Sequence, residues 1–120
     1  MPILALDHIQ LAMPAGREAE ARAFYTGLLG LPEVPKPPSL AKRGGAWFEQ
    51  GAMRVHLGVE QEFRPALKAH PAFLVDDLEV MAERLRAGGA PVKPDAPDDG
   101  RPRFFTADPF GNRIEIIARR

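Results

Sequence analysis

Residues 7–13 have the sequence Asp-His-Ile-Gln-Leu-Ala-Met, and residues 70–76, His-Pro-Ala-Phe-Leu-Val-Asp, repeat their pattern in the second half of the chain. Each segment carries a histidine near its start and then alternates in side-chain character. Such alternation predicts a strand whose apolar row lies on one face, with His8 or His70 on the other. We therefore expect strands over residues 4–13 and 70–76.

The chain around these segments repeats as well. Each half continues with an amphipathic helix, a glycine stop, an irregular stretch and a hairpin. The expected helices cover residues 18–29 and 77–86, and the expected hairpin strands 45–49, 53–59, 104–107 and 113–118. Such a repeat indicates one domain of two modules, about 1–60 and 68–120. The predicted core contains Leu11, Leu28, Leu57, Phe73, Leu85, Ile114 and Ile116.

Four potential metal ligands occupy equivalent places in this repeat. His8 and His70 open the two halves, while His56 and Glu115 lie on the last strand of each. Each of them alternates with apolar neighbours, so all four are expected on the face away from the apolar row. Imidazole and carboxylate groups that converge on one open sheet face suit a divalent Zn, Ni, Fe, Mn or Co ion. Gln10 shares the parity of His8 and is a candidate for binding substrate.

Composition excludes several other classes of protein. The 120 residues include 16 basic and 16 acidic side chains and no cysteine. Zero net charge argues against nucleic acid as a partner, and the lack of cysteine excludes disulfides and thiolate chemistry. Apolar runs are far shorter than the ~18 residues of a membrane span. The apolar start of the chain follows no basic segment, so we expect no signal peptide and a cytoplasmic location.

Four ordered stretches extend over nearly the whole chain: Asp7-His8-Ile9-Gln10-Leu11, Phe24-Tyr25 with Leu29-Gly30-Leu31, His70-Pro71-Ala72-Phe73-Leu74-Val75-Asp76, and Asp108-Pro109-Phe110-Gly111-Asn112-Arg113-Ile114-Glu115. Together they resemble the vicinal oxygen chelate superfamily, which includes glyoxalase I, bleomycin-resistance proteins, fosfomycin-resistance transferases and extradiol dioxygenases. The resemblance implies an α+β fold of two βαβββ modules, whose sheets curl around a concave metal or ligand cleft.

The resemblance also implies a set of site residues. Members with two histidines and one carboxylate match His8, His70 and Glu115, which would bind one divalent metal ion. Glyoxalases commonly have glutamate at the position of His56, so this chain departs from their ligand set. His56 is then a fourth ligand, a hydrogen-bond donor to one of the ligands, or a pocket wall. Glu115, or a metal-bound water, would move the proton in catalysis.

The expected function is that of a glyoxalase-like, metal-dependent enzyme acting on a small substrate with two neighbouring oxygens. The chemistry would be that of a lyase, isomerase or transferase, through an oxyanion. The alternatives are a metal-free binding protein that sequesters a small molecule, a transferase of the fosfomycin type and an extradiol dioxygenase. A homodimer is expected, because a chain this short leaves sheet edges for a two-fold partner to cover, and the resemblance suggests dimers too.

Overall fold

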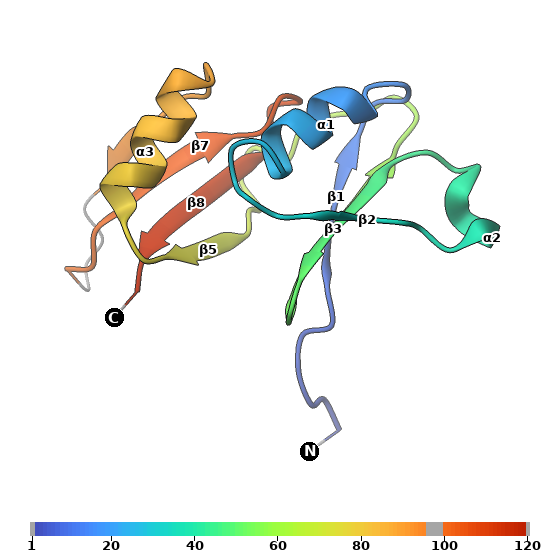
Figure 1. Cartoon of the computed structure of the whole chain (residues 1–120), viewed down its shortest axis with the longest axis horizontal. Helices are drawn as coiled ribbons and strands as arrows, with labels where there is room; N and C mark the ends of the chain where they lie inside the picture. The colour runs from blue at the N-terminus through green and yellow to red at the C-terminus, as the bar shows by residue number, and fades with distance from the viewer. Residues whose placement is uncertain (1, 96–99, 120) are drawn as a thin grey trace. The chain divides into compact units, whose positions relative to one another are not determined.

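The computed structural model describes residues 2–95 and 100–119, which form two compact units, Met1–Arg64 and Pro65–Arg120 (Figure 1). Part of the predicted irregular stretch 91–103 lies outside the described residues. None of the described helices has the length and apolar character that crossing a membrane requires. The elements of the first unit are β1 (Ile9–Met13), α1 (Glu18–Tyr25), β2 (Glu33–Val34), α2 (Pro38–Ala41), β3 (Ala46–Gln50) and β4 (Met53–Val59).

Within its described residues, the second unit repeats this order without a counterpart of α2. Each unit has one four-stranded mixed sheet, in the orders β1-β4-β3-β2 and β5-β8-β7-β6. In both sheets the first strand is parallel to the last, and the other pairs are antiparallel. The predicted α+β fold of two βαβββ modules is thus confirmed. The elements of the second unit are β5 (Ala72–Val75), α3 (Leu78–Ala87), β6 (Lys93–Asp95), β7 (Arg103–Ala107) and β8 (Arg113–Ala118).

In the first unit, side-chain alternation separates the core from an open face. Helix α1 packs on the apolar side, where the Tyr25 ring stacks on Phe48 with 5.3 Å between centroids. Val55 and Leu57 are buried on this side. Residues that alternate with Val55 and Leu57 along β4, and their partners on β1 and β3, point to the opposite side of the sheet. This opposite side, here called the unit 1 open face, contains Gln10, Trp47, Glu49, Arg54 and His56.

The second unit is built in the same way. Helix α3 lies across β7 and β8 (Figure 1), and its Leu85 is buried with Phe104 and Ile116. Phe73 is also buried, whereas its neighbour Leu74 is 64% exposed, as the predicted parity requires. The side away from α3, here called the unit 2 open face, contains Ala72, Leu74, Arg103, Phe105, Arg113 and Glu115.

Several predicted boundaries are wrong. Strands β1 and β5 begin at Ile9 and Ala72, so His8 and His70 lie just before their strands. Helix α1 ends at Tyr25. Beyond it, the N–H groups of Gly27 and Leu29 bond carbonyls five residues back, so the regular four-residue ladder is interrupted. The residue pattern by itself predicted neither strand β6 nor helix α2.

The predicted core is largely confirmed. Leu57, Phe73, Leu85, Ile114 and Ile116 are buried. Leu28 is only half-buried, because it follows the end of α1. Leu11 is half-buried as well, because it lies on an edge strand.

The turn between β7 and β8 is held by one buried carboxylate. Asp108 accepts hydrogen bonds from the backbone N–H groups of Phe110 and Asn112 and from the Asn112 side-chain amide, at 2.9–3.0 Å. Gly111 adopts a φ of +92°, which glycine tolerates best. This turn joins the two strands of the predicted hairpin, and it sets the register that pairs Phe105 with Glu115.

Asp77 begins α3 as its N-cap. Its carboxylate accepts a hydrogen bond from the Val80 N–H at 3.1 Å. Asp77→Ala leaves this helical N–H without its partner, and we expect the free energy of unfolding to fall by about 1 kcal/mol. Urea denaturation measures the change, with Glu79→Ala on the same helix as a control for a lost surface charge. A loss no larger than that of the control contradicts the capping role.

Candidate functional site

His8 is oriented by the acidic residue that precedes it. The His8 Nδ1–H donates to an Asp7 carboxylate oxygen at 2.9 Å, and Arg54 donates to the other oxygen at 3.0 Å. The His8 hydrogen bond and the charge of Arg54 hold the pKa of Asp7 below its ordinary value. An ionised Asp7 can only accept, so the His8 proton is placed on Nδ1. In neutral His8, the lone pair is therefore on Nε2.

His56 is enclosed between two rings on the unit 1 open face. Its imidazole stacks on Trp47 with 3.9 Å between centroids and an interplanar angle of 2°. The His8 ring also stacks on it, at 4.4 Å and 24°. Its Nε2–H donates to Glu49 at 2.7 Å, and the residue is 5% exposed. These contacts restrict rotation of the ring and leave only Nδ1 as a free nitrogen.

Gln10 lies flat across the neighbouring strand. A Cβ atom on Gly58 would lie 2.6 Å from the Gln10 side-chain nitrogen, so glycine at that position makes room for the amide. The register pairs Gln10 with His56. The three residues predicted for the first module, His8, Gln10 and His56, thus lie together.

In the second unit, His70 and Glu115 are in direct contact. The His70 Nδ1–H donates to the Lys68 carbonyl at 2.9 Å, and His70 Nε2 lies 3.1 Å from a Glu115 carboxylate oxygen. With Nδ1 protonated, Nε2 of a neutral ring has a lone pair, which cannot donate to a carboxylate. The contact therefore needs a proton between the two atoms, carried by either of them, or a cation that both atoms bind. The role of the pair as metal ligands stays a prediction.

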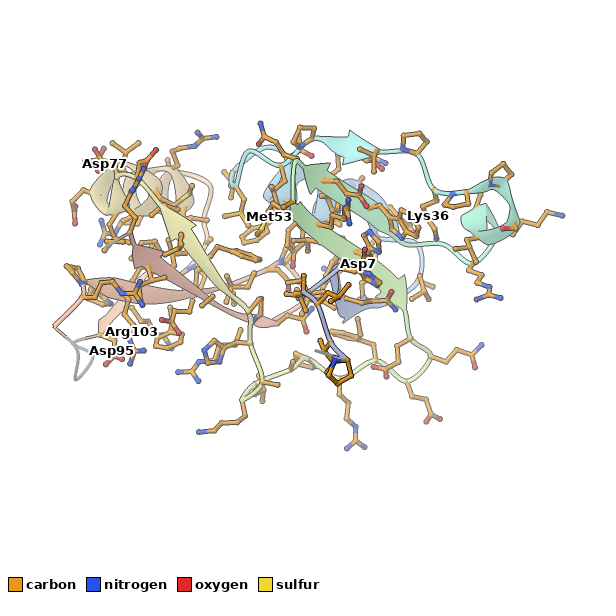
Figure 2. The ribbon with its side chains drawn as sticks, turned by 90° about the horizontal axis from the view of Figure 1, so that it is seen from below. Asp7, Lys36, Met53, Asp77, Asp95 and Arg103 are labelled. Carbon is orange, nitrogen blue, oxygen red and sulfur yellow. The ribbon has the colours of Figure 1, made fainter. Side chains whose placement is uncertain are left out.

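Arg103 is the other partner of Glu115. It donates to Asp95 at 2.6 and 3.0 Å and to the second Glu115 oxygen at 3.4 Å. Figure 2 shows Arg103 and Asp95 side by side. The hydrogen bond to Asp95, together with the charges of both carboxylates, raises the pKa of Arg103. Arg103 thus balances part of the negative charge of Glu115. The Glu115 side chain is buried, although it lies on the unit 2 open face.

The predicted ligands fit a divalent cation by their chemistry. In residues 2–95 and 100–119, no group of three or more His, Cys, Asp or Glu side chains is arranged to hold a metal ion. The pair His70 and Glu115 offers one nitrogen and one carboxylate oxygen. His8 offers a further nitrogen, and its proton is fixed by a carboxylate, as is common for metal-binding histidines. His56 differs, since its Nε2 is already bound to Glu49.

Three supporting residues were not found from the sequence. Asp7 is next to His8 and could have been recognised as its partner, because carboxylates often fix a ligand histidine. Glu49 and Arg103 gave no local signal. They reach His56 and Glu115 only through the antiparallel register of β3 with β4 and of β7 with β8.

The duplicated module and its open faces define a protein of the vicinal oxygen chelate superfamily. A family model of the glyoxalase-like domain matches residues 10–117, and the chain belongs to this family. No protein of curated function matches the sequence.

Solved structures agree with this assignment. A protein assigned to the glyoxalase family from Bacillus anthracis has 47% sequence identity and a TM-score of 0.92, with 98% of this chain and 97% of that chain covered. Lactoylglutathione lyase from Agrobacterium tumefaciens has 24% identity and a TM-score of 0.71, covering 98% and 96%. A genomically encoded fosfomycin resistance protein from Listeria monocytogenes has 17% identity and a TM-score of 0.78, covering 98% and 95%. The last two show the fold alone.

Proposed function

We propose that the protein is a metal-dependent enzyme of the glyoxalase type, acting on a small molecule with two neighbouring oxygens. His8, His70 and Glu115 would hold one divalent Zn, Ni, Fe, Mn or Co ion. The observation that carries this proposal is the 3.1 Å contact between His70 Nε2 and Glu115, which requires a proton or a cation. Asp7 binds Nδ1–H of His8, and the Lys68 carbonyl binds Nδ1–H of His70. The Nε2 lone pair of each ring is therefore left to bind a metal ion.

The ligand set comes from both units. His8 belongs to the first unit and His70 and Glu115 to the second. The proposal requires that both kinds of unit supply ligands to the same cation, either from one chain or from the two chains of a dimer. When bound, the cation acts as a Lewis acid that stabilises negative charge developing on the substrate oxygens.

The remaining roles follow from chemistry on the open faces. Glu115 is the proposed proton acceptor and donor, because it is a carboxylate beside the ligand nitrogen of His70. Gln10 has an amide that can donate to a substrate oxygen. His56, clamped by Trp47 and Glu49, is proposed as a wall that holds the His8 ring through stacking.

A metal-free binding protein is the second candidate. The specific observation in its favour is that Glu115 already has two cationic or potentially cationic partners, His70 and Arg103. Such a protein would retain the open faces and sequester a small molecule without a cation.

Metal content separates the two candidates. Protein purified without a histidine tag is analysed for metals, and the metal-depleted protein is then titrated with each of the five cations by calorimetry. We expect one cation to bind per chain with saturation. Absence of saturable binding for all five, in folded protein, rejects the enzyme proposal in favour of the binding protein.

Asp7→Asn tests the support given to His8. The amide keeps the size of the side chain but removes the charge that makes the imidazole more basic. We expect metal affinity to fall about tenfold, the lower end of the effect of such supporting groups, because Asp7 is solvent-exposed. Competition with a chelating dye measures the affinity, and Asp76→Asn, an exposed aspartate paired with Arg119, is the control. Equal affinities in the two variants refute the supporting role.

We also propose a homodimer. Strands β1 and β5 are edge strands, and the segment before β1 exposes Ile3, Leu4 and Leu6. Exposed apolar side chains beside an unpaired strand edge favour association. Light scattering at micromolar concentration should give about twice the chain mass of 13.2 kDa. A mass of one chain contradicts the proposal.

A further inference from the structure

A cavity of about 440 Å³ lies in the second unit. Glu115 is next to lining residues of this cavity but does not line it. Its volume lies within the range of about 300–1,000 Å³ usual for small-molecule sites. Strand β7 contributes Phe105, which pairs with Glu115 in the sheet, and Arg113 lies two residues before Glu115 on the same face. Further lining residues are Leu67, Lys93, Asp95 and Gly111.

The cavity carries positive charge that no described carboxylate neutralises. Lys93 and Arg113 both line it, and neither forms an ion pair within residues 2–95 and 100–119. Asp95 is the acidic residue of the described lining, and its carboxylate is bound by Arg103. Two unpaired cations beside one satisfied carboxylate favour an anionic ligand.

The guanidinium of Arg113 is held in place for such a ligand. It lies over the Phe105 ring, 3.9 Å from the centroid. This cation–π contact restricts the side chain before binding, which lowers the entropy lost when an anion is captured. The planar fork of arginine matches a carboxylate with two parallel hydrogen bonds. Phe105, Leu67 and Pro94 supply apolar surface for the body of the molecule.

We propose that this cavity binds a small organic acid. Arg113 and Lys93 hold its carboxylate, and its apolar part lies against Phe105. If the acid is the substrate, the inference rests on the proposed function, and the cavity holds the end of the substrate that does not react. Binding of the acid itself needs no metal ion.

The test uses phenylacetate as the probe and its uncharged amide, phenylacetamide, as the matched control. ¹⁵N-labelled full-length protein, freed of metal by a chelator, is titrated with each and followed by NMR. We expect saturable shifts of the Phe105, Ala107 and Gly111 amides with phenylacetate. Phenylacetamide should bind about tenfold more weakly or worse, because it lacks the negative charge that Arg113 and Lys93 would bind.

Substitutions of the two cationic lining residues test whether they bind the carboxylate of the probe. Arg113→Gln and Lys93→Gln should each weaken phenylacetate binding about fivefold or more. Arg86→Gln, on the exposed surface of α3, should leave it unchanged. The inference is overturned if phenylacetate gives no saturable shift, if phenylacetamide binds equally well, or if neither lining variant weakens binding.

The two proposals fail in distinguishable ways. Phenylacetate binding in a protein that takes up no divalent cation supports this site and rejects the metal-dependent enzyme. Metal binding without saturable phenylacetate binding supports the metal-dependent enzyme and rejects the organic-acid site. Phenylphosphonate, titrated in parallel, reports whether the site prefers a carboxylate; tighter binding of the phosphonate overturns the assignment to carboxylic acids.

Discussion

Glu115→Gln should weaken binding of the proposed divalent cation by more than about 100-fold, beyond the 10- to 100-fold cost usual for supporting groups. Glutamine preserves the volume of the side chain and can still accept a hydrogen bond from Arg103. It removes the negative charge, which is the only anionic group in the proposed ligand set. Because Glu115 is buried, no solvent-exposed carboxylate can replace it without rearrangement.

The experiment compares metal affinity with stability. Isothermal calorimetry gives the affinity of metal-depleted protein, and urea denaturation shows whether the unliganded fold is kept to within about 2 kcal/mol. Glu79→Gln, on the exposed side of α3, is the matched control and should bind metal as the parent does. His70→Ala should behave like Glu115→Gln, since it removes the nitrogen in contact with Glu115.

The outcome against the proposed site is clear. Unchanged metal affinity in both Glu115→Gln and His70→Ala, measured on folded protein, refutes the ligand assignment. A large loss of stability without metal would instead assign the pair a structural role. The circular dichroism spectrum and the urea midpoint of each unliganded variant distinguish these results.

Phe73→Ala should lower the free energy of unfolding by about 3–5 kcal/mol. Phe73 is buried on the side of β5 that faces the core, in register with Ile116 of β8. Alanine removes the whole ring from a packed sheet-and-helix layer, and the strand cannot collapse into the space because β8 fixes its register. The loss therefore includes both transfer of the ring and an unfilled cavity.

Leu74→Ala is the control for Phe73→Ala. Leu74 is the next residue on the same strand but points to the opposite, exposed side. Its truncation should cost no more than about 0.5 kcal/mol, as is usual for exposed positions. Chemical denaturation monitored by circular dichroism measures both variants. A loss below about 1 kcal/mol for Phe73→Ala contradicts the assigned parity of β5.

Alternation along the chain was sufficient to determine which side of each strand faces the core. His8, Gln10 and His56 gather on one side of the first sheet because parity is a local property with a period of two residues. The duplicated order of elements determined that the chain forms two similar modules, since a repeat of one sequence pattern yields the same module twice. Glycine and proline positions likewise determined the turn over 108–112.

Tertiary structure decided the partners of each site residue. Arg103 reaches Glu115, and Glu49 reaches His56, through the register of neighbouring strands, which no spacing in the sequence reveals. The direct contact of His70 with Glu115 joins residues 45 positions apart. It forms because β5 is parallel to β8, a pairing that depends on packing of the whole module. Sequence pattern determines the face on which a side chain lies, whereas only folding determines what it meets there.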